Sequence, residues 1–179
     1  MPLYITNGST SKRMGGYIQS QQGSMIPTNA ATTGDLTDQN FTASGVSDLR
    51  VTMGVPHSLN SVFEITGQAQ LHTDTPTSGG ATDTGGYAGL SIQRSTNGGS
   101  SFSTIRSHGR WSEGINADND LNTRIQIFFR DRPNTTGTVI YRLGWNAHRS
   151  KVYFGRQPSN QSGGTTNLIV YEYDNGETS

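Results

Sequence analysis

The sequence predicts an all-β protein, an antiparallel β-sandwich or jelly roll with an extended N-terminal arm. Three observations predict this fold. Short apolar segments follow the two-residue period of a strand, clusters of Gly, Asn, Ser and Thr separate them, and no stretch has the composition of a helix. The overall composition agrees, because 23 of the 179 residues are Gly and only 15% are charged, which is typical of a chain with many turns.

Residues 1–47 differ from the rest of the chain. Their few large apolar residues are isolated and follow neither strand nor helix period. We expect an extended arm that becomes ordered on a neighbouring subunit, with a flexible leader as the alternative. The predicted divisions are 1–47 for the arm, 48–175 for the jelly-roll domain and 176–179 for a C-terminal tail.

Eight strands are expected from residue 48 onward. The alternation is clearest in Ser61–Leu71, where every second residue is apolar, as in a half-buried strand. A turn at Asn97–Gly99 predicts a hairpin, because Asn and Gly readily adopt positive φ. The expected strands are Leu49–Val55, Ser61–Leu71, Tyr87–Thr96, Ser100–Arg106, two within Ile125–Trp145, Lys151–Arg156 and Asn167–Tyr173.

The stretch Ile125–Trp145 is interpreted as two strands of a second hairpin, joined by a turn at Asp131–Gly137. Each strand has one strongly apolar face, which is expected to be buried and to include Trp145. Phe128 and Ile140 fall on the opposite faces of their strands, so a second surface must cover them.

The last expected strand, Asn167–Tyr173, is apolar on both faces and should therefore be central or covered twice. Leu168 and Val170 lie on one face. Together with Phe128 and Ile140, the other face predicts an apolar outer surface too large to remain in water. The residues expected on that surface are Phe128, Ile140, Ile169, Tyr171 and Tyr173.

Composition excludes several classes of function. With 13 basic and 13 acidic residues the net charge is zero, so neither nucleic-acid binding nor attraction to anionic membranes is expected. The chain has no cysteine, which excludes disulfides and thiolate metal sites. Because there is no signal-peptide pattern and no run of about 20 apolar residues, we expect neither ordinary secretion nor membrane insertion.

No catalytic motif stands out, and we expect no enzyme, no cofactor and no metal. The histidines His57, His72, His108 and His148 are scattered, and no nucleophile elbow is present. A glycosidase pair could be drawn from Glu64, Glu113 and Glu172, but Glu64 and Glu172 are interpreted as outward-facing, solvated carboxylates. A polysaccharide hydrolase remains the least favoured alternative.

The segment Asp118–Asn122 spaces three oxygen ligands like the start of an EF-hand loop. The match then fails, because Thr123 replaces the glycine and Phe129 replaces the bidentate Glu. An exposed polar turn is the simpler interpretation, and calcium binding is the alternative. Arg106 and Trp111 are candidate ligand contacts, since aromatic rings beside arginine suit sugars or partner proteins.

Three motifs carry a resemblance to a known family: "GLSIQRSTNGGSSFSTI", "FFRDRPNTTGTVIYRLGW" and "VYFGRQPSNQSGGTTNLIVYEYD". In their order they resemble the trimeric jelly-roll domains of tailed-bacteriophage virions, chiefly of marine and cyanobacterial phages, and more broadly the tumour-necrosis-factor-like trimers. The resemblance covers about half of the chain. The residues that carry most of it are Arg94, Asp131, Pro133, Tyr141 and Leu143.

The resemblance implies a virion structural protein, such as a capsid decoration or knob protein or a tail accessory. It further implies a homotrimer that contacts other capsid or tail proteins, with the apolar outer surface as the subunit interface. The arm would anchor the chain to the particle through Leu3, Tyr4, Ile5, Tyr17 and Ile18. A tail-fibre tip that binds a receptor or a host surface glycan is the alternative.

Overall fold

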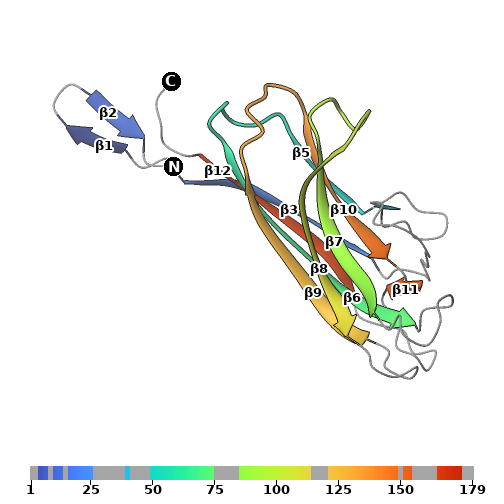
Figure 1. Ribbon diagram of the computed structural model, residues 1–179. Coiled ribbons are helices and arrows are strands. Elements are labelled where there is room, and N and C mark those ends of the chain that lie inside the picture. The colour runs from blue at the N-terminus through green and yellow to red at the C-terminus, as the bar shows by residue number, and fades with distance from the viewer. Residues whose placement is uncertain are drawn as a thin grey trace.

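The computed structural model describes residues 4–7, 10–13, 16–25, 39–40, 49–74, 85–113, 121–148, 151–154 and 165–174. Figure 1 shows two β-sheets stacked face to face, with no helix in the described ranges. Consequently, no helix able to cross a membrane occurs within these ranges either. A separate two-stranded hairpin, β1 (Tyr4–Asn7) and β2 (Thr10–Arg13), pairs only with itself among the described strands.

The ten strands of the sandwich divide equally between the sheets, and every neighbouring pair is antiparallel. The first sheet contains β3 (Tyr17–Met25), β6 (Val62–Asp74), β9 (Leu121–Asp131), β11 (Lys151–Phe154) and β12 (Thr166–Tyr173). The second contains β4 (Gln39–Asn40), β5 (Arg50–Gly54), β7 (Gly85–Ser95), β8 (Ser103–Glu113) and β10 (Val139–His148).

The strand order is that of a jelly roll. Without the two short strands β4 and β11, the first sheet runs β3–β12–β6–β9 and the second runs β5–β10–β7–β8. The first and last strands of the sandwich are therefore neighbours, and consecutive strands often lie in opposite sheets, as expected for two interlocked Greek keys. The predicted fold class is confirmed, and each of the eight expected strands overlaps an observed one.

The sandwich begins earlier than the sequence analysis expects. Tyr17–Met25, which falls within the expected arm, is β3 and pairs with β12 over its length, and Gln39–Asn40 pairs with β10. The division at residue 47 is therefore not the edge of the jelly roll. The strand escaped prediction because β3 is an edge strand whose sequence, YIQSQQGSM, is polar on both faces.

The expected hairpin within Ile125–Trp145 is wrong. Its two strands exist, but β9 pairs with β6 in one sheet and β10 pairs with β7 in the other. The connection between them crosses from sheet to sheet and includes Asn134 at φ 47°. A Cβ on Gly137 in this connection would lie 2.6 Å from the Thr96 carbonyl oxygen, so the crossing requires glycine there.

The core fills the space between the sheets. Alternation places Phe63, Ile65 and Ala69 of β6 inward, where all three are fully buried. The second sheet contributes the expected inward face of β10, including Trp145. The remaining buried members include Val51, Met53, Leu90, Ile92, Ile125, Ile127, Val139, Tyr141, Leu143, Leu168 and Val170.

The expected hairpin turn between β7 and β8 is confirmed. Gly98 and Gly99 have φ of 69° and 90°, which side chains with a Cβ rarely adopt. The hydroxyl of Ser95 accepts a hydrogen bond of 2.9 Å from the Gly99 amide, which closes the turn. The Arg142 guanidinium lies over the ring of Phe102 from this hairpin, on the outer surface of the second sheet. The distance from Arg142 Cζ to the ring centroid is 3.8 Å.

Candidate functional site

The outer face of the first sheet carries three exposed aromatic rings, those of Tyr17, Phe128 and Tyr171. Strand alternation turns Ile169, Tyr171 and Tyr173 of β12 away from the core, while Leu168 and Val170 are buried. Phe128 of β9 and Tyr17 of β3 lie on the same outer face, with 58% and 57% of their surface exposed. We call these five residues, Tyr17, Phe128, Ile169, Tyr171 and Tyr173, the outer tyrosine face.

Three tyrosines of this face form a cluster. The ring centroid of Tyr17 lies 6.4 Å from that of Tyr171 and 6.1 Å from that of Tyr173, and the latter two are 6.5 Å apart. Tilted and edge-to-face rings at such spacings attract one another. The Tyr17 hydroxyl donates to Ser20 at 2.9 Å. The cluster therefore fixes the orientation of rings that remain accessible to a partner.

Polar cross-strand pairs surround these rings. Arg130 of β9 forms an ion pair with Glu64 of β6, directly opposite it in the register. Gln126 donates to Gln68 at 3.3 Å on the same face. Aromatic groups within a polar surround are typical of protein-contact surfaces.

An open pocket of about 420 Å³ lies at one end of the outer tyrosine face. It is built by the ends of all four long strands of this sheet and the residues that adjoin them. Its lining residues are Gly16, Val62, Glu64, Arg130, Arg132, Tyr173 and Asp174. A hydrogen bond of 2.9 Å from the Asp174 amide to the Gly16 carbonyl closes the end of the β3–β12 pair beside the pocket.

The structure brings together four of the five residues predicted for the apolar outer surface and separates the fifth. Ile140 belongs to β10 in the second sheet, where it pairs with Ser95 and Thr52 and is only 6% exposed. The β7–β8 turn adjoins it, since a Cβ on Gly99 would lie 3.4 Å from the Ile140 side chain. The chain itself thus covers Ile140, and it does not share a surface with Phe128.

The residues predicted for particle anchoring fall in two places. Tyr17 and Ile18 are in β3, where Tyr17 joins the tyrosine cluster. Tyr4 and Ile5 are in β1, opposite Arg13 and Lys12 of β2. Leu3, like the side chains of Tyr4 and Ile5, lies outside the described residues.

The two candidate ligand contacts lie on the edge strand β8. Arg106 is exposed and pairs with Ile92, and Trp111 pairs with Tyr87. The Trp111 side chain lies outside the described part of the structure. A charged residue such as Arg106 on an edge strand also protects that edge against pairing with other chains.

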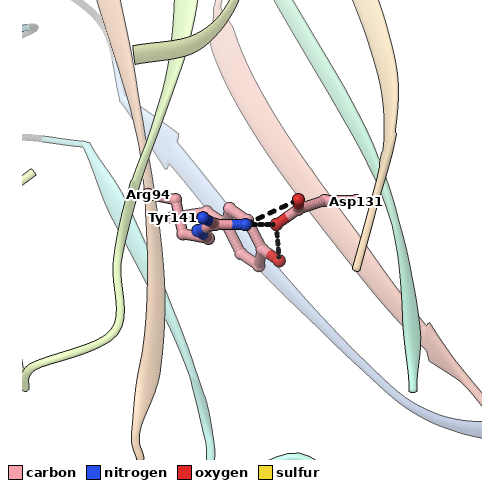
Figure 2. Close-up of polar contacts among 3 residues, drawn as sticks. All are labelled: Arg94, Asp131 and Tyr141. Atoms are coloured by element: carbon pink, nitrogen blue, oxygen red, sulfur yellow. Dashed lines mark hydrogen bonds and ion pairs between the residues drawn. The ribbon is translucent and has the colours of Figure 1, made fainter. Parts of the chain in front are cut away.

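A second polar group, which the sequence did not reveal, joins the two sheets across one end of the core (Figure 2). The Asp131 carboxylate of β9 accepts from the Arg94 guanidinium at 2.7 and 2.9 Å and from the Tyr141 hydroxyl at 2.8 Å. Burial is the main cause that raises the pKa of Tyr141 far above its usual range, and the negative charge of the Asp131 carboxylate is the second cause. All three are among the residues that carry the resemblance stated above, and their contacts indicate a structural role.

Glu172 is not the outward-facing carboxylate that the sequence analysis expects. It shares the inward face of Leu168 and Val170 and is fully buried. Its oxygens accept 2.6 Å hydrogen bonds from the His57 backbone amide and from the Gln19 side chain. The pattern itself, two residues beyond Val170, could have revealed this orientation.

The geometry of the described residues gives little support to the catalytic and metal-binding alternatives considered from the sequence. Glu64 faces outward and Glu172 inward on the same sheet, so they do not form a catalytic pair. Glu113 has its side chain outside the described residues, and Asp118–Asp120 lie outside them altogether. His57 and His108 are exposed in the described part of the chain, where no group of three or more potential ligands could hold a metal ion.

No protein-family model matches the sequence, and no curated protein is significantly similar to it. Among solved structures, the chain is weakly similar to infectious bursal disease virus of strain Gt, with 10% identity, a TM-score of 0.33 and coverage of 96% of this chain and 42% of that one. The structure of strain Gx has 11% identity and a TM-score of 0.30, and the match covers 99% of this chain and 42% of that one. The VP2 subviral particle of the same virus has 10% identity and a TM-score of 0.28, and the match covers 97% of this chain and 46% of that one.

The chain spans less than half of the length of each of these three viral chains. TM-scores this low carry no argument about shared fold or function. The jelly-roll assignment therefore rests on the strand order and register of the chain itself.

Proposed function

We propose that this protein is a structural component of a tailed-bacteriophage virion, either a capsid decoration or knob protein or a small tail accessory. The protein assembles into a homotrimer through the outer tyrosine face. The observation that carries the proposal is the exposure of Tyr17, Phe128 and Tyr171 on one sheet of a jelly roll. The resemblance of its motifs to virion jelly rolls supports the class of particle. Fold alone would not, because jelly rolls also form lectins and cupins.

The outer tyrosine face has the character of a protein interface. Tyr and Phe are enriched at the centres of such interfaces, where they bury large apolar areas at low cost in side-chain entropy. Leaving Phe128 in water forfeits a burial energy of about 2 kcal/mol. A neighbouring subunit on this face would recover it, and the surrounding Thr66, Gln68 and Gln126 would form a polar rim.

Assembly would leave the remaining surfaces for other virion proteins. The N-terminal residues Leu3, Tyr4 and Ile5 are the proposed contact with the particle. Ile140 is not part of the proposed interface, because the chain's own turn covers it.

The test is the native mass of the purified chain and of Phe128→Asp, measured by light scattering coupled to gel filtration. We expect the wild type at three times 19.3 kDa and the variant at 19.3 kDa with an unchanged circular dichroism spectrum. Ser107→Asp, a neutral-to-acidic change at an exposed residue of β8 in the second sheet, is the control and should remain trimeric. A monomeric wild type, or a folded Phe128→Asp trimer, would contradict the proposal.

A further inference from the structure

The pocket at the end of the outer tyrosine face combines three kinds of surface. Its lining carries two arginines, Arg130 and Arg132, and two carboxylates, Glu64 and Asp174, so its formal charges cancel. Val62 and Tyr173 supply the apolar part of the lining. Tyr17 stands beside it, more than half exposed, with its ring edge-on to that of Tyr173.

We propose that this pocket binds a neutral sugar residue of the hexose class. Sugar hydroxyls both donate and accept hydrogen bonds, which matches guanidinium donors beside carboxylate acceptors. The C–H face of a pyranose ring can lie on a tyrosine ring, and the pocket volume falls within the range of small-ligand sites. The Tyr17 ring is oriented for this contact by its two neighbouring tyrosines.

The charge balance selects a neutral sugar over its acidic relatives. A carboxylate or sulfate group on the ligand would gain from Arg130 and Arg132 but would face Glu64 and Asp174 at the same time. Arg130 already forms an ion pair with Glu64, which reduces its attraction for a second anion. Its side chain is nevertheless 66% exposed, so other N–H groups of the guanidinium face solvent.

This site adjoins the proposed subunit interface and shares Tyr17 and Tyr173 with the outer tyrosine face, but its charged groups lie away from Phe128. Phe128 pairs with Thr66 in the middle of the sheet, whereas the pocket lies where Val62 pairs with Tyr173 at the strand ends. The experiments are therefore performed on the protein in its native assembly. Native mass reports on the interface, and sugar binding reports on the pocket, so failure of one is distinguishable from failure of the other.

The first experiment is saturation-transfer NMR on the wild type with the methyl glycosides of glucose, galactose, mannose and N-acetylglucosamine. N-acetylneuraminic acid and glucuronic acid are the charged comparators. We expect transfer to the ring protons of at least one neutral glycoside and none to the acids. Absence of transfer to every neutral glycoside, or transfer to the acids alone, would overturn the inference.

The second experiment locates the site with matched arginine variants. Arg130→Ala should weaken the binding of the preferred glycoside about tenfold or more, since it removes hydrogen bonds from a charged donor. Arg124→Ala changes an exposed arginine six residues earlier, on the same face of the same strand but away from the pocket, and should leave affinity unchanged. Equal effects of the two substitutions would contradict this location.

Tyr17→Ala provides a further test should Arg130→Ala disturb the sheet. It removes the exposed ring beside the pocket and should likewise reduce affinity about tenfold. Retention of full affinity by this variant would overturn the stacking role. Binding by the monomeric Phe128→Asp variant but not by the assembled wild type would mean that assembly covers the pocket, and would contradict the inference for the native protein.

Discussion

The carboxylate of Asp131, at the end of β9 in one sheet, accepts a 2.8 Å hydrogen bond from the hydroxyl of Tyr141 on β10 in the other. Arg94 of β7 completes the group with an ion pair in which one guanidinium nitrogen, Nη1, donates to both oxygens of the same carboxylate. The Tyr141 ring also packs against Phe63, with centroids 5.6 Å apart. One residue thus ties β9 and β10, which are consecutive in the chain but lie in opposite sheets.

Asp131→Asn should destabilise the fold by about 2–3 kcal/mol, because it leaves Arg94 without its charged partner in a partly buried position. The side chain of Arg94 retains 25% exposure, which keeps the cost below that of a fully buried charge. Tyr141→Phe removes only one hydrogen bond and should cost about 1–2 kcal/mol. Urea denaturation of both variants measures the difference, and an equal or smaller effect of Asp131→Asn would contradict this interpretation.

Stability should fall at alkaline pH because of Tyr141. In the folded state its pKa is raised by burial and by Asp131, whereas in the unfolded chain it ionises near the usual value of about 10. Above about pH 10 the unfolded state therefore loses a proton that the folded state keeps. The free energy of unfolding should then decrease by about 1.4 kcal/mol per pH unit from this residue.

The alkaline prediction is checked by urea denaturation of the wild type and of Tyr141→Phe between pH 9 and pH 11. The difference between their unfolding free energies isolates the residue from other titrating groups. That difference should be constant below about pH 10 and should shrink above it. A difference that stays constant up to pH 11 would show that Tyr141 does not titrate differently in the two states.

Glu172→Gln should destabilise the protein by about 1–3 kcal/mol, because an amide replaces one of two acceptor oxygens in a fully buried site. The backbone amide of His57 and the side chain of Gln19 would compete for the remaining acceptor. Glu64→Gln, the same change at the partly exposed ion pair with Arg130, should cost about 0–1 kcal/mol. Thermal unfolding of the two variants ranks them, and the reverse order would contradict the burial of Glu172.

Ile140→Asp and Phe128→Asp should differ in their effects on stability and assembly, although the sequence pattern places both residues on strand faces opposite the core. Ile140 is buried under the β7–β8 turn, so a carboxylate there should cost about 3 kcal/mol or more and reduce the yield of folded protein. Phe128→Asp should change assembly and leave the fold intact. Circular dichroism with urea titration distinguishes these outcomes, and a fully stable Ile140→Asp variant would contradict the assignment.

The strands that were predictable from sequence are those with a buried face. Alternation in β6 and in β12 identified the inward residues Phe63, Ile65, Leu168 and Val170. β3 gave no such signal, because a polar edge strand owes its place to the β12 backbone and not to its own side chains.

Pairing partners were not predictable in the same way. The apolar faces of β9 and β10 indicate that both strands contact the core. Two strands paired in one sheet and two strands in opposite sheets have the same alternation of apolar and polar residues, so the pattern does not distinguish them. The distinction depends on the connection, in which Gly137 and Asn134 direct the chain to the other sheet. For the same reason, the sequence grouped Ile140 with Phe128.

The candidate site was only partly predictable. The outward side chains of β12 and Phe128 followed from alternation, but Tyr17 joins them only through the pairing of β3 with β12. The pocket depends on the ends of four strands that are far apart in sequence, and no local pattern predicts such a meeting.

The most direct test of the outer tyrosine face as an assembly surface is hydroxyl-radical footprinting of the native wild-type protein, read by mass spectrometry. Leu59 and Val55, exposed at 51% and 59% in the loop between β5 and β6, are internal references. We predict that Phe128 and Tyr171 are strongly protected relative to these references in the wild type and become reactive on dilution or in gel-filtered monomer. Oxidation of Phe128 and Tyr171 at the rates of freely exposed side chains in the native protein would contradict the account.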